Sequence, residues 1–159
     1  MTQPRDKTAP FGLQISIPRQ RLELVETSRV TRSYPVSTSR FGLGSEPGSF
    51  KTPLGRFRVA EKIGAGAELG MIFKSRAPVG RIGSPLQPDD FVQTRILWLD
   101  GLDAHNANTH DRYIYIHGTN QEPQLGLPVS HGCIRMGNAE VAELFELVPE
   151  GCPVVIDLE

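Results

Sequence analysis

The sequence predicts a fold that is mostly β with one clear helix, and three observations support this prediction. Short runs of alternating apolar and polar residues, typical of half-buried strands, recur along the chain. Glycine, proline and serine separate these runs. A helical spacing of apolar residues is found in a segment near the C-terminus. The 159 residues, 38% of them hydrophobic, fit a single domain over residues 1–159, with 1–12 expected to be a flexible N-terminal segment.

The first part of the chain is expected to form a β-meander. Strands are predicted over residues 13–17, 22–24 and 30–36, where apolar residues alternate with polar ones. Residues 37–55 are rich in glycine, serine and proline and read as a long connection. Connections of this length in a compact domain tend to be functional, so we expect this one to lie near a site.

The middle of the chain contains a second long aperiodic stretch. Strands are predicted at residues 57–63 and 71–74, and a buried strand at 96–99. Between the last two, residues 75–93 contain three prolines and lose periodicity. We interpret this stretch as a candidate lid over the site. The alternative is a surface excursion with no role.

The C-terminal part predicts one amphipathic helix and a closing strand. Asn138 is a plausible N-cap. Apolar residues then follow at helical spacing, namely Val141, Leu144, Phe145 and Val148. Pro149 and Gly151 end the helix, and residues 153–158 supply the strand.

Charge and hydropathy exclude several classes of partner. Lys and Arg number 17 against 18 acidic residues, and neither sign forms a block, so nucleic acid is not an expected partner. The longest apolar run, residues 96–99, is far short of the roughly 18 residues of a membrane span. The N-terminal residues do not resemble a signal peptide. We therefore expect a cytoplasmic protein, or a periplasmic or cell-wall protein if an export signal has been removed.

The reactive residues concentrate between Tyr113 and Gly137. Residues 113–116 are aromatic or β-branched and predict a strand that delivers His117 at its end. Cys133 follows Gly132, whose missing side chain lets a substrate carbonyl approach the local amides. A thiol, an imidazole and a turn with accessible backbone amides are the components of a covalent acyl-transfer site.

The cysteines and two of the charged or titratable residues near Cys133 also have purely structural interpretations. A free cysteine is usually a small buried hydrophobe, but the polar neighbours of Cys133 argue against that role. His131 is as suited to bracing the turn as to reacting. Arg135 suits two roles equally, binding of a substrate carboxylate and bracing of the loop. Cys152 is expected to pack in the core, and both cysteines are expected to be reduced because a disulfide would block the nucleophile.

A metal site is the alternative to a thiol site. The candidate ligands do not show a known zinc-binding spacing, so no metal and no cofactor are predicted. These candidates are His105, His110, His117, His131 and Cys133.

Several segments together resemble the L,D-transpeptidase catalytic domain family of the YkuD type. The central segments are His117-Gly118-Thr119-Asn120 and Ser130-His131-Gly132-Cys133-Ile134-Arg135-Met136. The resemblance extends upstream to residues 34–38 and 52–57 and downstream through 147–151. Only the first dozen residues and the 75–93 stretch lie outside it.

The resemblance implies a mixed β-sandwich and a cysteine acyltransferase that acts on peptidoglycan stem peptides. Cys133 would attack the carbonyl of the third stem residue and expel the terminal D-alanine. His117 would be the base, oriented by the carbonyl of Gly118, and amides near Gly132 and Cys133 would form the oxyanion hole. The neighbouring motif residues would line or support the pocket: Ser130, His131 and Arg135. The sequence departs from the family at Cys152, where a threonine or similar residue is expected.

The acyl acceptor separates two activities. Exported family members usually use an amine and form cross-links, whereas a minority without export signals use water and trim soluble muropeptides. With no recognisable signal, the sequence favours an L,D-carboxypeptidase of muropeptide recycling, with an L,D-transpeptidase as the alternative. A non-catalytic peptidoglycan-binding module is a third, weaker hypothesis. The third stem residue and the oligomeric state are left open.

Overall fold

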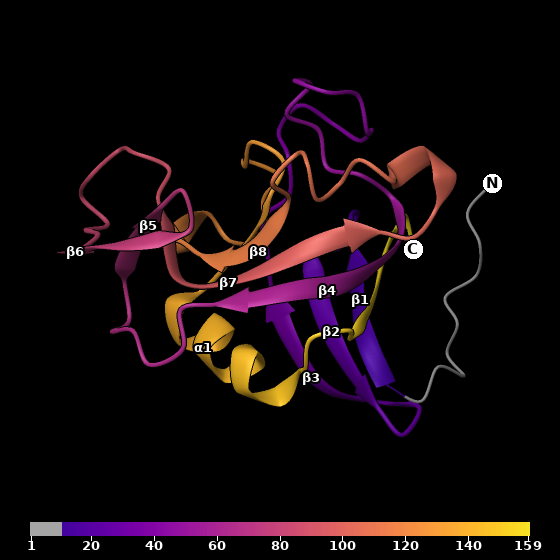
Figure 1. The fold of residues 1–159 in the computed structure, drawn as a ribbon, viewed down its shortest axis with the longest axis horizontal. Helices are drawn as coiled ribbons and strands as arrows, with labels where there is room; N and C mark the ends of the chain where they lie inside the picture. Colours follow the sequence, from indigo (N-terminus) through magenta and orange to yellow (C-terminus); the bar gives the residue numbers. More distant parts are fainter. Residues whose placement is uncertain (1–10) are drawn as a thin grey trace.

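The computed structural model describes residues 11–159, which form a mostly β structure with one α-helix (Figure 1). The strands are β1 (Phe11–Ser16), β2 (Arg21–Glu26), β3 (Arg29–Pro35), β4 (Gly55–Ile63), β5 (Met71–Lys74), β6 (Ala77–Ile82), β7 (Val92–Gly101), β8 (Tyr115–Gly118), β9 (Ile134–Met136) and β10 (Pro153–Asp157). The helix is α1 (Asn138–Leu147), and two short 3-10 turns cover Ala104–Asn106 and Glu122–Gln124.

The strands form a mixed sheet in which the order along the sheet differs from the order along the chain. The main path is β3-β2-β1-β10-β4-β7-β5-β6, and β8 pairs with both β7 and β9. The β1–β10 and β8–β9 pairs are parallel, and the other strand pairs are antiparallel. Strand β10 therefore joins the β1–β3 meander to the rest of the sheet.

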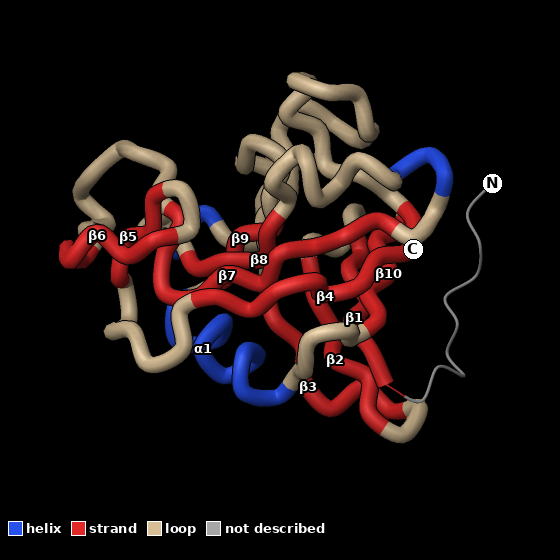
Figure 2. Tube along the Cα trace, viewed as in Figure 1, coloured by secondary structure: helices blue, strands red, loops and turns tan. Residues whose placement is uncertain are grey.

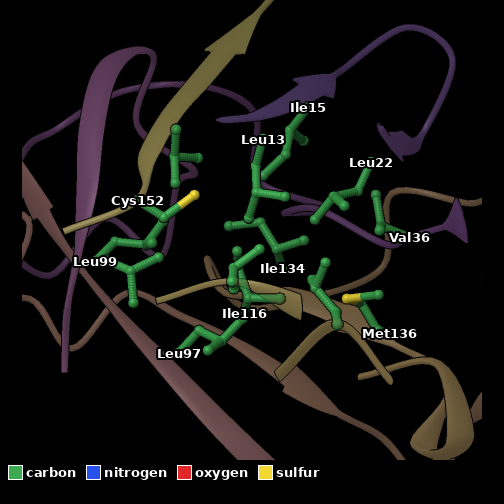
Figure 3. Close-up of a cluster of buried hydrophobic side chains, with 14 of the residues drawn as sticks. Leu13, Ile15, Leu22, Val36, Leu97, Leu99, Ile116, Ile134, Met136 and Cys152 are labelled. Atoms are coloured by element: carbon green, nitrogen blue, oxygen red, sulfur yellow. The ribbon is translucent and has the colours of Figure 1, made fainter. Parts of the chain in front are cut away.

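The main core lies between two parts of this sheet. Leu13, Ile15 and Leu22 on one side face Leu97 and Ile134 on the other (Figure 3). Helix α1 packs against β7 and β8 and buries one apolar face in the same core. This arrangement confirms the expected fold class, a mostly β, sandwich-like architecture with a single clear helix.

A smaller apolar cluster lies on the opposite face of β7 and β8. It contains Phe73, Ile96, Trp98 and Tyr115. Because side chains alternate along a strand, β7 and β8 contribute to both clusters. Cys133 packs against this second cluster rather than the main core. Loops gather on the side of the sheet away from α1 (Figure 2).

The predicted lid, residues 75–93, is in part regular structure, so its description as a loop was wrong. It contains β6, and its last two residues begin β7. Every residue of β6 is exposed, which removes the apolar alternation that would have indicated a strand. Pro78 and Gly80 lie within this edge strand, where a missing ladder hydrogen bond is tolerated.

Element boundaries also differ from the prediction. The buried strand expected at 96–99 is β7, which extends over Val92–Gly101. The strand expected at 113–116 is β8, which begins at Tyr115, because Tyr113 has a left-handed φ of 58°. The N-cap of α1 is Gly137, not Asn138. The side chain of Asn138 instead bonds to Thr94 and Thr119, so it joins the start of the helix to the strands.

The N-terminal segment expected to be flexible falls mostly outside the described residues. Residues 1–10 are not described, whereas Phe11 and Gly12 pair with β2 as the start of β1. Across residues 11–159, no helix combines the length and hydropathy of a membrane span.

Leu99 provides a test of the main core. Its side chain is fully buried, so Leu99→Ala should lower the free energy of unfolding by about 2 to 5 kcal/mol through lost burial and a residual cavity. Urea denaturation would measure the change. Leu86→Ala is the matched control, because Leu86 is 92% exposed and its truncation should leave stability nearly unchanged. Equal losses in both variants would contradict this assignment of the core.

Candidate active site

The register of two short parallel strands places the candidate residues on one face. Ile116 of β8 pairs with Ile134 of β9, and His117 pairs with Arg135. Both isoleucines are buried in the main core. Because side chains alternate, His117 and Arg135 point to the opposite face. Cys133, in the turn before β9, packs against the smaller apolar cluster on that same face. The structure thus brings the predicted thiol and imidazole to the same side of the sheet.

His117 is held as a neutral imidazole. Its side chain is buried, and Nδ1 lies 2.6 Å from the carbonyl oxygen of Gly118. Since a carbonyl only accepts, Nδ1 carries the hydrogen and Nε2 is the basic nitrogen. Burial lowers the pKa of His117, while the negative charge of Asp90 and the Gly118 contact oppose this shift. The expected role of the Gly118 carbonyl as an orienting group is consistent with this geometry.

Gly118 itself cannot carry a side chain. A Cβ at this position would overlap the side-chain oxygen of Asn138 and approach the carbonyl of Gln93. The backbone of Gly118, whose carbonyl accepts from His117, is therefore packed against Asn138, the first residue of α1.

Cys133 rests as a thiol. The residue is partly exposed, and its Sγ donates to the carbonyl of Tyr113 at 3.3 Å and accepts from the amide of Tyr115 at 3.4 Å. Burial of the sulfur raises its pKa to about 11, against the lowering effects of the Tyr115 amide and the Arg135 charge. Proton transfer to His117 therefore requires the thiol to leave the Tyr113 carbonyl.

The turn that carries Cys133 is fixed by hydroxyl groups. The Ser130 Oγ donates to the Cys133 carbonyl at 2.7 Å and accepts from the Gly132 amide at 3.2 Å. The Thr52 Oγ1 donates to the Gly132 carbonyl at 2.9 Å. Gly132 has a φ of 119°, which a residue with a side chain rarely adopts. The Gly132 amide already donates to Ser130, so the amide of Cys133 is the better candidate donor to an oxyanion. The oxyanion hole itself stays a prediction.

Arg135 and His131 share one carboxylate, that of Asp90. The Arg135 Nη2 lies 2.8 Å and the His131 Nδ1 3.1 Å from the same Asp90 oxygen. Arg135 is 3% exposed, whereas His131 is half-exposed and also contacts the rings of Phe41 and Phe50. Burial acts to raise the pKa of Asp90, but a protonated His117 and the charge and hydrogen bond of Arg135 hold it below its usual range.

Sequence reasoning missed Asp90 and Arg112 as parts of the site. Arg112 donates to the carbonyls of Gly44 and Lys51 at 3.2 and 2.8 Å, which fixes the 37–55 connection beside the Cys133 turn. Asp90 lies in a stretch without apolar periodicity, next to Asp89. Two adjacent acidic residues in a loop are usually solvent-exposed and have no specific role. The only hint was the position of this pair in the candidate lid.

The remaining candidate ligands lie elsewhere. His105 contacts the carbonyl of Leu54, and the ring of His110 stacks on Trp98 with centroids 3.9 Å apart. In the described part of the chain, no three His, Cys, Asp or Glu side chains converge as metal ligands would.

Comparison of the sequence with protein families gives a match over nearly the whole chain. The model of the YkuD L,D-transpeptidase catalytic domain matches residues 10–156. A Bacillus subtilis protein that carries the provisional name L,D-transpeptidase YkuD is 29% identical over 154 residues, which is 97% of this chain and 70% of that protein. The YbiS protein of Escherichia coli K12, also named an L,D-transpeptidase, is 33% identical over 109 residues, 65% of this chain and 32% of that protein.

Solved structures show the same fold. An L,D-transpeptidase fragment from Xylanimonas cellulosilytica aligns with a TM-score of 0.61 and 24% identity over 96% of this chain. A cysteine-to-serine mutant of the Enterococcus faecium L,D-transpeptidase aligns with a TM-score of 0.59 and 18% identity over 92% of this chain. This chain spans 62% and 49% of those two solved chains. Because the family match covers almost every described residue and the fold agrees, the chain belongs to the L,D-transpeptidase catalytic domain family.

Proposed function

We propose that this chain is a cysteine acyltransferase that releases the terminal D-alanine from peptidoglycan stem tetrapeptides through an acyl-enzyme on Cys133. The observation that carries the proposal is the placement of the Cys133 thiol and the neutral His117 on one side of the sheet, outside the main core. Membership in the L,D-transpeptidase catalytic domain family supports a substrate of the peptidoglycan class.

The chemistry follows from the resting protonation states. As the thiol attacks the carbonyl carbon of the third stem residue, its proton passes to Nε2 of His117 and a carbon–sulfur bond forms. The carbonyl oxygen becomes an oxyanion, for which the Cys133 amide is a donor. Collapse breaks the carbon–nitrogen bond, and the departing D-alanine amine takes the proton from His117. A thioester on Cys133 remains.

Two acceptors are compatible with this thioester. Water would regenerate the thiol and release a tripeptide, which is L,D-carboxypeptidase activity. A stem-peptide amine would form a cross-link, and the L,D-transpeptidase names of the relatives favour this second candidate. The cytoplasmic location expected from the sequence stays a prediction, which fractionation of cells that express the untagged protein would test.

The Cys133→Ala variant tests the nucleophile. It should release no D-alanine from disaccharide tetrapeptide and form no covalent adduct, because the attacking sulfur is absent. Mass spectrometry of substrate and protein would measure both. Cys152→Ala is the control, since Cys152 is buried in the main core and should leave activity intact. Persistent activity in Cys133→Ala would refute the proposal, and tight tetrapeptide binding without turnover in the unmodified protein would instead indicate a binding module.

Addition of an amine acceptor separates the two activities. With tetrapeptide alone and water as acceptor, the expected product is tripeptide. With a second stem peptide that bears a free amine, a carboxypeptidase continues to give tripeptide, whereas a transpeptidase gives cross-linked dimer. Liquid chromatography with mass detection would quantify the products, and a dominant dimer would contradict the carboxypeptidase proposal.

The raised pKa of Cys133 predicts the pH dependence of its alkylation. Only the thiolate reacts, and below a pKa of about 11 its fraction rises with pH. The rate of iodoacetamide labelling of Cys133 should therefore increase about tenfold per pH unit from pH 7 to 10. Peptide mapping would follow the label. An ordinary thiol, with a pKa of about 8.5, would instead reach a plateau near pH 9.5, and that result would contradict the assigned environment.

A further inference from the structure

We propose that Asp90 occupies a carboxylate-binding site formed by Arg135 and His131, and that the terminal carboxylate of the substrate displaces it. The inference rests on the proposed function for the identity of the ligand. It does not depend on that function for its test. Three properties of the contact support it.

The first property is the burial of the Arg135 guanidinium, the positive charge that would bind the substrate carboxylate. The side chain of Arg135 is 4% exposed, and a buried guanidinium requires a compensating anion. Asp90 supplies that anion from a different part of the chain, with its own side chain 33% exposed. The carboxylate can therefore move to solvent without unfolding the core, while the guanidinium remains in place for another anion.

The second property is that Asp90 uses only part of the donor capacity of Arg135. The contact runs from Nη2 to a single carboxylate oxygen, which also faces His131. The Nε of Arg135 is buried and has no acceptor among residues 11–159. A carboxylate that pairs with Nε and Nη2 together would form the stronger two-bond contact that guanidinium groups favour. A substrate carboxylate can thus compete with Asp90.

The third property is the attachment of the Asp90 loop. The side-chain amide of Asn120 donates to the carbonyls of Ser84 and Gln87 at 3.1 Å each, and Gln121 donates to Gln87 at 2.6 Å. These bonds fix the backbone of the loop at Ser84 and Gln87, which precede Asp90 in the chain. The carboxylate can leave Arg135 while the loop stays anchored, which makes the exchange local.

The position of the site fits the proposed ligand. Arg135 of β9 lies two residues beyond Cys133 and pairs with His117, and Cys133 packs on the same side of the sheet. The carboxylate of a terminal D-alanine lies only two bonds beyond the scissile nitrogen, so its charge stays near the thiol during attack. Exchange with Asp90 would select stem peptides with a free C-terminal carboxylate over amidated ones.

Alkylation of Cys133 with two small reagents tests the proposal without peptidoglycan. Iodoacetate carries a carboxylate, and iodoacetamide is its neutral counterpart. If Asp90 blocks a carboxylate site, Asp90→Asn should raise the ratio of the iodoacetate rate to the iodoacetamide rate about tenfold, the effect of one charge-assisted contact. The ratio cancels changes in thiol reactivity, because both reagents require the same thiolate.

Asp89→Asn is the matched control, because it removes the same charge one residue away from the Arg135 contact. This variant should change the ratio by less than about twofold, as expected for a screened exposed charge. A second substitution, Arg135→Gln in the Asp90→Asn background, should abolish the gain. If that double variant does not fold, the comparison of the two aspartate variants still decides the question.

The outcomes separate this proposal from the proposed function. An unchanged ratio in Asp90→Asn, or equal increases in both aspartate variants, would overturn the carboxylate site even if tetrapeptide is cleaved. A selective increase in Asp90→Asn would support the site even if tetrapeptide is not a substrate. With an active enzyme, Asp90→Asn should also lower the KM for tetrapeptide, and Asp89→Asn should not.

Discussion

The alternation of side chains along the β8–β9 pair is the constraint on which the candidate site depends. Ile116 and Ile134 are fully buried in the main core, and this burial fixes the rotation of both strands. His117 and Cys133 must then face away from that core. A shift of one residue in either strand would exchange the two faces and bury a titratable group in an apolar environment. Core packing and site geometry are therefore the same structural requirement.

Hydrogen bonds from segments that are distant in the sequence stabilise the turns and loops around the β8–β9 pair. Thr52 holds the Gly132 carbonyl, and Arg112 holds the 37–55 connection beside it. Asn138 links the start of α1 to the loop that follows His117. Each contact satisfies a backbone carbonyl that would be costly to leave unpaired in a buried position. These contacts tie the candidate site, which lies on β8 and in the turn before β9, to three segments that are distant in the sequence.

The sequence predicted the candidate-site residues that are local in the chain but not those that the tertiary structure brings to them. His117 and Cys133 stand out because their neighbours have a distinctive local pattern, and the mostly β fold follows from apolar alternation. Strand β6 was missed because an exposed edge strand has no buried face to produce a pattern. Asp90 was missed because its significance comes from Arg135, which is distant in sequence. The N-cap of α1 was misplaced because the side chain of Asn138 is used by tertiary contacts instead of by its own helix.

The position of β10 in the sheet has a consequence for the order of folding. Among the named strands, the β1–β3 meander reaches β4 only through β10, which follows the site strands in the chain. The two parts of the sheet are therefore synthesised before the strand that joins them. Pairing between β1 and β10 closes a very long loop, and contacts of such separation form late because their entropic cost is high. Cys133 is therefore synthesised before β10, the strand through which the two parts of the sheet that enclose the main core are joined.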